Sequence, residues 1–344
     1  MNQVGSDFME NDADLPPRGG DQRELLSRKM AALLRITRLS DRLIYERTTN
    51  LLEFEWRMIM RLGFHGPSLV WELAHLLDVD RAQASRAASQ LTDLGLVARQ
   101  GSRGALKLSA TGSEMYGVLR RLSLARNALL TANLSTEQRS NFEFVLMRFH
   151  ENVHHLFDGG ERQEELLDRR AKLRGDIYPQ ADIAEGGEFE TNELVVVPAV
   201  LLVLRAIRRN ILPAFKELSG LSEIEWIVLA WVSGPNGMPL QQLVANMERD
   251  KSQVGRAVKR LIERGLIASA NSSPRAVLLR TLPAGDETYV RIAAEADRHE
   301  QLYLAGISDA QAGMFRSSLS LMIENALRLL AYDRATAGAS PLAA

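Results

Sequence analysis

Apolar residues recur along the chain at the intervals expected of helices. Near the C-terminus, Phe315, Leu319, Ile323, Leu327 and Leu330 follow one another at steps of three or four residues. That spacing predicts one buried stripe along an amphipathic helix. Over the whole chain the pattern predicts a mainly α-helical protein. Each half has a long helix, three shorter helices, a short β-hairpin and two further long helices.

This order of elements occurs twice because the sequence contains an internal repeat. Glu55-Trp56 recurs 170 positions later as Glu225-Trp226. After an insertion of three residues between about Arg99 and Gly112, the offset becomes 173. Since whole elements recur in register, we interpret the chain as a tandem duplication. Further matching pairs are Leu73 with Leu243, Asp80 with Asp250, Gly95-Leu96 with Gly265-Leu266, Gly112 with Gly285 and Tyr116 with Tyr289.

Breaks in the pattern suggest where the repeats begin and end. Residues 1–20 contain Pro16-Pro17 and Gly19-Gly20 and are predicted to be disordered. The expected order is then a first repeat over 21–157, a linker over 158–192, a second repeat over 193–333 and a short tail over 334–344.

The middle of each half predicts two short helices followed by a hairpin. Asp80 can cap the second helix of the first half, and Gly95 suits the left-handed position that ends it. This is the order of a helix–turn–helix motif with a β-wing. The expected helices are Ser68–Leu77 and Arg81–Leu94 in the first half, and Leu240–Met247 and Asp250–Arg264 in the second. The expected wing strands are Leu96–Arg99 and Ala105–Leu108, and two strands that flank residues 271–274.

The second helix of each motif has an apolar face for docking and a polar, basic face. The chain has a net charge of −1, yet residues 80–107 hold five basic and two acidic side chains, and residues 250–280 hold seven and two. An α-helix fits the DNA major groove, where Arg reads guanine and Gln reads adenine. The motif therefore predicts a regulator that binds double-stranded operator DNA. The candidate DNA-binding residues are Arg81, Gln83, Ser85, Arg86, Ser89, Gln90 and the wing residue Arg103, and Lys251, Ser252, Gln253, Arg256, Lys259, Arg260 and the wing residue Arg275.

Both halves resemble the multiple-antibiotic-resistance-regulator (MarR) family of winged-helix transcription factors. The resemblance is carried by Leu51–Ile59 (LLEFEWRMI), Leu221–Leu229 (LSEIEWIVL), Asp250–Arg256 (DKSQVGR) and the Gly-Leu pairs that close the second helices, and it covers roughly 270 residues. Family members are homodimers whose first and last two helices interleave. The resemblance implies two tandem winged-helix repeats whose long terminal helices form an intrachain pseudo-dimer, with further homodimerisation left open. Because the two recognition helices differ, we expect two unlike half-sites.

The resemblance also implies a small effector, such as an aromatic acid or a phenol, that relieves repression. Family members bind such molecules between the dimerisation and DNA-binding parts, at the first helix and the start of the second. A core or surface role is the alternative for each candidate. The candidate effector-binding residues are Arg38, Tyr45, Trp56, Arg57, His65 and Trp226, with Arg205 and Phe215 in the opposite half.

Two other functions remain open. His150-Glu151-Asn152-Val153-His154 has the H-E-x-x-H spacing of zinc hydrolases, in which two histidines bind zinc and the glutamate activates water. The matching segment of the second half, Ile323–Leu327, lacks both histidines, which argues against a metal or an enzyme. The other alternative is a winged-helix module that binds protein. We expect no enzymatic activity, cofactor or bound metal.

Composition narrows the remaining classes. The chain of 344 residues contains no cysteine, which excludes a disulfide scaffold, a thiolate zinc site and a cysteine nucleophile. The N-terminus lacks the apolar core of a secretory signal. The longest apolar run, Leu194–Leu204, has 11 residues, far fewer than the roughly 20 of a spanning helix. We expect a cytoplasmic protein with no membrane partner.

Overall fold

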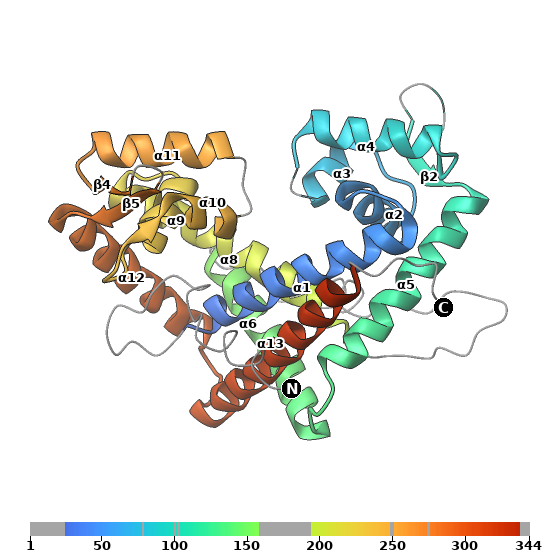
Figure 1. Ribbon diagram of the computed structural model, residues 1–344. Coiled ribbons are helices and arrows are strands. Elements are labelled where there is room, and N and C mark those ends of the chain that lie inside the picture. The colour runs from blue at the N-terminus through green and yellow to red at the C-terminus, as the bar shows by residue number, and fades with distance from the viewer. Residues whose placement is uncertain are drawn as a thin grey trace, which may run out of the picture. The chain divides into compact units, whose positions relative to one another are not determined.

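The computed structural model describes residues 25–77, 79–99, 101, 104–157, 194–247, 251–273 and 276–337 (Figure 1). The predictions for residues 1–20, for the linker 158–192 and for Arg103 and Arg275 at the wing tips fall outside these residues. The described part is mainly helical with two small antiparallel sheets, as predicted. No helix in it is both long and apolar enough to cross a membrane.

The elements follow the predicted order in each half. The first half holds α1 (Leu26–Thr49), α2 (Glu53–His65), α3 (Val70–Leu77), α4 (Arg81–Asp93), β1 (Val97–Arg99), β2 (Leu106–Leu108), α5 (Ala110–Leu130) and α6 (Thr136–Phe157). The second half holds α8 (Val196–Ser219), α9 (Glu223–Val232), β3 (Met238–Pro239), α10 (Leu240–Met247), α11 (Lys251–Glu263), β4 (Ile267–Ser273), β5 (Ala276–Thr281), α12 (Pro283–Tyr303) and α13 (Asp309–Ala337). Helix α13 continues past residue 333, where the sequence predicts the tail to begin.

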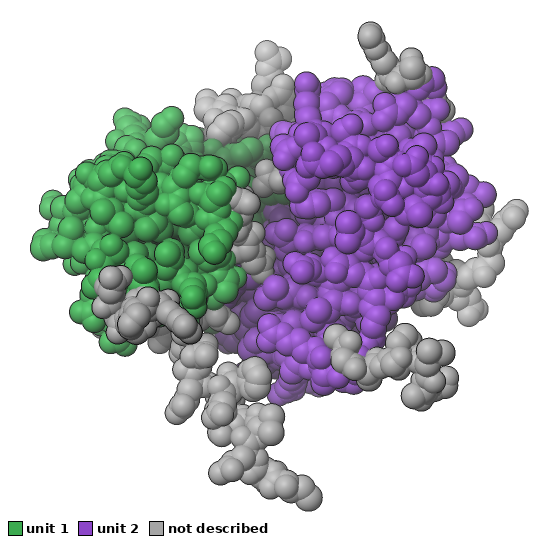
Figure 2. All heavy atoms as spheres, turned by 45° about the horizontal axis from the view of Figure 1, so that its top comes forward, with its two compact units in different colours: residues 1–29, 147–162, 202–308 green, residues 30–146, 163–201, 309–344 purple. Residues whose placement is uncertain are grey.

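The chain folds into two compact units, which Figure 2 colours separately. Unit 1 comprises residues 1–29, 147–162 and 202–308, and unit 2 comprises residues 30–146, 163–201 and 309–344. Unit 2 therefore contains α2 to α5 together with α13, whereas unit 1 contains α9 to α12 together with the C-terminal part of α6. Each unit combines segments from both halves of the chain.

The winged helix of unit 2 is built on α2, α3 and α4. Ser68 does not begin α3 as predicted, because its backbone pairs with that of Leu106 in an extended bridge. The side chain of Asp80 caps α4 by accepting a hydrogen bond from the Gln83 amide at 2.7 Å. Strands β1 and β2 form the hairpin that the sequence predicts.

The winged helix of unit 1 has the same elements and one further strand. Strands β4 and β5 form the wing, and the short β3, which the sequence analysis did not anticipate, pairs with the other edge of β5. Met238 of β3 occupies the repeat position of Ser68. The close packing of helix on hairpin is also shared: a Cβ on Gly112 would lie 1.9 Å from the Leu96 carbonyl oxygen, and one on Gly285 2.0 Å from that of Leu266. Only glycine fits at these two positions.

The apolar stripe of α13 differs from the predicted one. Phe315, Leu319 and Leu330 are buried, but Leu327 is 48% exposed, and Met322 and Ala326 complete the stripe instead of Ile323 and Leu327. A step of four residues exceeds one helical turn by roughly 40°. Three such steps in succession therefore move a residue off the buried face.

Matching residues of the two halves make matching contacts with the opposite half. Asn152 of α6 and Asn325 of α13 stand at the same repeat position, and each side-chain amide donates two hydrogen bonds to the carboxyl end of a helix from the other half. Asn152 Nδ2 bonds the carbonyls of Tyr303 and Ala305 in unit 1 at 2.7 and 2.8 Å. Asn325 Nδ2 bonds those of Leu130 and Ala132 in unit 2 at 3.0 and 3.1 Å.

Two further hydrogen bonds also join residues of one half of the chain to residues of the other. The amide of Leu26 at the start of α1 donates to Glu300 Oε1 at 2.7 Å, and that of Val196 at the start of α8 donates to Asn127 Oδ1 at 2.9 Å. Phe142 and Phe315, which are repeat counterparts of one another, stack with ring centroids 4.6 Å apart.

Candidate nucleic-acid interface and ligand cavity

Helix α4 presents the two faces that the sequence predicts. Ala84, Ala87, Ala88 and Leu91 are buried in the core of unit 2. The opposite face is polar, and no carboxylate interrupts it between Arg81 and Gln90. Of the predicted DNA-binding residues on this helix, Gln83 is half-buried, while Arg81, Ser85, Arg86, Ser89 and Gln90 are exposed.

Helix α11 is arranged in the same way in unit 1. Val254, Ala257, Val258 and Leu261 are buried in its core. The predicted DNA-binding residues Lys251, Ser252, Gln253, Arg256, Lys259 and Arg260 are all exposed. Helices α4 and α11 are labelled in Figure 1.

Two of the basic side chains on α11 already have carboxylate partners. Arg260 Nε lies 2.6 Å from Oε1 of the buried Glu225 on α9, and Lys259 Nζ lies 3.7 Å from Glu263 Oε1. Glu225 also accepts a hydrogen bond from the backbone amide of Ser222 at 2.7 Å, so this carboxylate joins the start of α9 to α11. Burial opposes the charge on Glu225, but the bonds from Ser222 and Arg260 lower its pKa. Arg260 is therefore held toward α9, whereas Arg256 carries no such partner among the described residues.

A cavity of about 300 Å³ lies within unit 2, between α1, α2 and α5. The first residues of α8 and Leu329 of α13 complete its wall. Its aromatic lining consists of Tyr45, Trp56, Phe64 and Tyr116, and Tyr45 meets Trp56 edge to face at 4.6 Å. The Trp56 indole N–H is buried and has no hydrogen-bond partner among the described residues. The volume and the largely apolar wall fit a small organic molecule.

The cavity contains four of the six predicted effector-binding residues, namely Arg38, Tyr45, Trp56 and Arg57. His65 is exposed and its ring nitrogen lies 2.9 Å from Arg61, outside the lining. Trp226 lies in unit 1, where its ring packs against Phe215. The sequence analysis missed the contribution of α5, which supplies Tyr116, Arg120, Ser123, Leu124, Arg126, Asn127 and Leu130.

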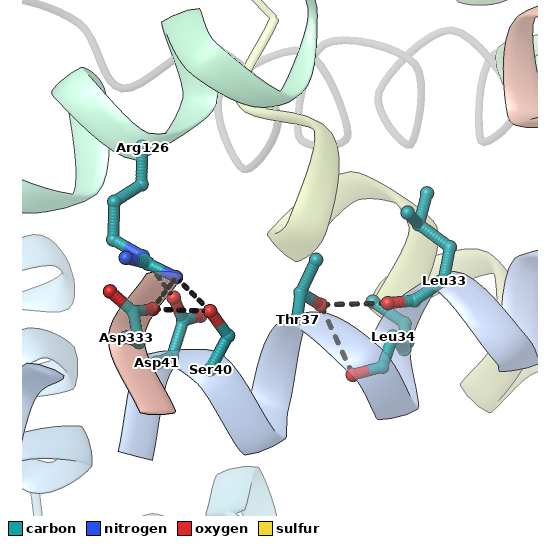
Figure 3. Close-up of polar contacts among 7 residues, drawn as sticks. All are labelled: Leu33, Leu34, Thr37, Ser40, Asp41, Arg126 and Asp333. Atoms are coloured by element: carbon teal, nitrogen blue, oxygen red, sulfur yellow. Dashed lines mark hydrogen bonds and ion pairs between the residues drawn. The ribbon is translucent and has the colours of Figure 1, made fainter. Parts of the chain in front are cut away.

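A buried ionic cluster contributes to the wall of the cavity (Figure 3). Arg126 of α5 reaches down between α1 and α13, with Nε 2.7 Å from Asp41 Oδ1 and Nη2 3.0 Å from Asp333 Oδ2. Arg126 also donates to Ser40 Oγ, and Ser40 in turn donates to Asp333. The side chain of Asp333 is only 4% exposed. One guanidinium thus connects three helices.

The cluster holds two carboxylates against one guanidinium, and this imbalance shifts its titration. Burial and the nearby charge of Asp333 raise the pKa of Asp41 to about 6, although Arg126 acts in the opposite direction. Burial opposes the charge on Arg126, but the two carboxylates keep its pKa above the ordinary value. Next to Asp41, burial also raises the pKa of Tyr45, which therefore remains a neutral phenol.

The two histidines of the H-E-x-x-H segment lie next to each other on α6. Nε2 of His150 and Nε2 of His154 are 3.1 Å apart, and Glu151 pairs with Arg148 at 3.3 Å. Within the described residues, no group of three or more His, Cys, Asp or Glu side chains is placed to hold a metal ion.

Comparison with known proteins gives no match to a family model or to a curated protein. Solved structures of MarR-family regulators match part of the chain. A transcriptional regulator from Rhodococcus sp. RHA1 is 25% identical and covers 36% of this chain and 91% of its own, with a TM-score of 0.31. A regulator from Listeria monocytogenes, solved with a 26mer DNA, is 25% identical over 39% of this chain and 91% of its own, with a TM-score of 0.34. A MarR protein from Peptoclostridium difficile is 19% identical over 44% and 99%, with a TM-score of 0.36.

Proposed function

We propose that the chain is a sequence-specific, DNA-binding transcriptional regulator of the MarR type, with two reading heads on one polypeptide. The observation that carries this proposal is the pair of helices α4 and α11. Each has a fully apolar docking face and an exposed polar face with arginines, Arg86 in one and Arg256 in the other. In a chain with a net charge of −1, these are local basic surfaces of the size that fits the major groove.

The proposal includes an intrachain pseudo-dimer. Three sets of contacts between the two halves support it: the asparagine caps, the hydrogen bonds at the starts of α1 and α8, and the Phe142–Phe315 stack. Each of the first two sets occurs once in each unit. In the third, a residue contacts its own counterpart. In a symmetric homodimer the same contacts would run between two identical chains. Here a single chain supplies both sides.

Fusion frees the two heads to read different sequences. The residues at matching positions differ, with Ser85 opposite Gly255, Ser89 opposite Lys259 and Gln90 opposite Arg260. We expect the operator to consist of two unlike half-sites, whereas a symmetric homodimer would favour a palindrome.

The proposal also includes a small effector that relieves repression. The cavity of unit 2 supports it, because it lies between the winged helix and the long helices α1, α5 and α13. A ligand that binds one arrangement of these helices better than another shifts the population toward that arrangement. In this account the ligand-bound population has lower affinity for the operator.

The dependence of DNA binding on salt tests the proposed function. Binding of a fluorescent random-sequence duplex is measured by anisotropy between 50 and 200 mM salt. Each phosphate contact releases counterions, so the affinity is expected to fall steeply, by about 10³-fold or more for six contacts. The Arg328→Ala variant, which changes an exposed arginine on α13, serves as the control and is expected to follow the same curve. Absence of duplex binding at the low-salt end contradicts the proposal and favours the protein-binding alternative.

A further inference from the structure

The cavity of unit 2 is more positive than the rest of the chain. Five arginines and two carboxylates line it. Glu53 is engaged by Arg38 at 2.7 Å and by Arg57 at 3.3 Å, and Asp41 is engaged by Arg126. Arg126 is also paired with Asp333, which lies outside the lining. Arginine is thus the commonest charged side chain in the wall, and a wall rich in guanidinium groups favours an anion.

Arg120 is the arginine best placed to meet that anion. It stands on α5 beside Tyr116, and it makes no ion pair with another described residue. Tyr116 and Arg120 are four residues apart on α5 and therefore lie on the same face of the helix. Burial raises the pKa of Tyr116, and the charge of Arg120 acts in the opposite direction. A ligand with its charged group at Arg120 and its apolar part between Tyr45 and Trp56 would contact both the charged and the aromatic side chains of the cavity.

At the matching place in unit 1, a large aromatic residue takes the position of one of the cavity residues. Leu130, which lines the cavity, corresponds to Tyr303 in the second half. Tyr303 is fully buried, and its hydroxyl donates to Asn210 Oδ1 at 2.8 Å. Asn210 is the counterpart of Ser40, the residue that Arg126 contacts in unit 2. The tyrosine side chain thus reaches from α12 to α8 within unit 1.

Several charged residues of the cavity are replaced by uncharged ones in the second copy. Arg57 corresponds to Ile227, Arg61 to Trp231 and Arg120 to Ala293. Asp41, the centre of the ionic cluster, corresponds to Ile211. The Arg38–Glu53 pair alone is kept, as Arg208–Glu223 at 2.6 Å. Both the size and the charge of matching residues therefore differ between the two copies.

From this asymmetry we infer that the chain binds one small aromatic anion per polypeptide, in the cavity of unit 2 with its charged group at Arg120, and none at the matching place in unit 1. This inference rests on the effector role proposed above and restricts it to one site. A fused chain has converted two equivalent ligand sites into a single one, and its response to ligand involves a single binding event.

Isothermal titration with 2-naphthalenesulfonate tests the inference. This anion keeps its charge over the whole working pH range, and the titration contains no DNA. The expected stoichiometry is one ligand per chain. Arg120→Gln is expected to weaken binding about tenfold or more, because a hydrogen bond to a charged group is lost. Arg121→Gln removes the same charge from the next, exposed position of α5 and is expected to leave the affinity unchanged.

The two tryptophans provide a second, matched pair of variants. Trp56→Phe is expected to weaken binding of 2-naphthalenesulfonate, whereas Trp226→Phe, at the same repeat position in unit 1, is expected to leave it unchanged. Two ligands per chain, equal effects of the two Trp variants, or no binding by the wild-type protein would overturn the inference. Because the same protein preparation is tested for duplex binding separately, failure of the ligand site and failure of the DNA-binding function give different results.

Discussion

At the residue scale, the most consequential side chains are those of the ionic cluster. Arg126 lines the cavity and at the same time joins Asp41 of α1 to Asp333 of α13. Breaking one partner of such a buried cluster leaves an uncompensated charge, which is more costly than losing a surface pair. The cluster therefore joins the wall of the cavity to the C-terminal helix.

Anion binding is expected to strengthen as the pH falls through about 6. Asp41 has a pKa raised to about 6, so in the folded protein it is charged at pH 7.5 and neutral at pH 5. Its carboxylate repels an anion in the cavity, and protonation removes that repulsion. The affinity for 2-naphthalenesulfonate should rise between about threefold and tenfold, which corresponds to a coupling of up to one pKa unit.

The Asp41→Asn variant provides the control for this pH dependence. It lacks the titrating group, so its affinity for 2-naphthalenesulfonate should vary little between pH 5 and pH 7.5. An equal pH dependence in the variant and the wild type would show that another group is responsible.

The arginines at the centre of each recognition helix should contribute to one half-site each. Arg86→Ala and Arg256→Ala are expected to weaken binding to the preferred duplex by about 1–3 kcal/mol each and to relax the preference at one base position. Anisotropy with duplexes altered in one half-site measures this. An equal loss on every sequence would instead identify the two arginines as phosphate contacts.

At the element scale, helices α6 and α13 join the two halves. Each carries one asparagine whose side-chain amide satisfies the last carbonyls of a helix from the opposite half. Those carbonyls have no partner within their own helix. The two asparagines thus act as caps supplied by a different part of the chain.

Removal of one of these caps should destabilise the fold. Asn325→Ala is expected to lower the free energy of unfolding by about 1–3 kcal/mol, because two backbone carbonyls near a buried position lose their donor. Chemical denaturation measures the change. Arg328→Ala, one turn further along α13 at a side chain that is 72% exposed, should change the value by less than about 0.5 kcal/mol. Equal effects of the two variants would argue against the cap.

The elements that were predicted well are those with a simple period. The small apolar face of α4 and the Gly-Leu pairs after α4 and α11 identify the winged helix, since they repeat in register. The predicted stripe of α13 was wrong at Ile323 and Leu327, because successive four-residue steps drift around the helix. The exchange of α13 between the halves could not be read from periodicity, since a stripe predicts burial but not its partner.

Only part of the cavity lining could be predicted from the sequence, because helix α5 lacks a clear pattern of apolar and polar positions. The resemblance placed it at α1 and α2, whereas Arg126 and Arg120 lie on α5, whose apolar and polar positions separate less clearly. A signal was nevertheless present in α1. Ser40 and Asp41 interrupt an otherwise apolar face that includes Leu33 and Ile36, and polar residues on such a face often belong to a buried network.

At the scale of the whole molecule, we propose that duplication followed by fusion accounts for the differences between the two cavity regions and between the two recognition helices. A homodimer must change both copies of a residue together, but a fused chain can change one. The second copy lacks several of the charged residues that line the cavity and has Tyr303 in place of Leu130, while its recognition helix has Lys259 and Arg260 in place of Ser89 and Gln90. We propose that the first half retains the sensing role and that both halves read DNA.

The most direct test of the central claim is selection of bound duplexes from a random DNA pool, together with the mass of the protein–DNA complex in solution. The account predicts an enriched site with two unlike halves about one helical turn apart, bound by a single chain. A perfect palindrome that requires two chains would contradict the fused reader, and the absence of any enriched sequence at low salt would contradict sequence-specific DNA binding itself.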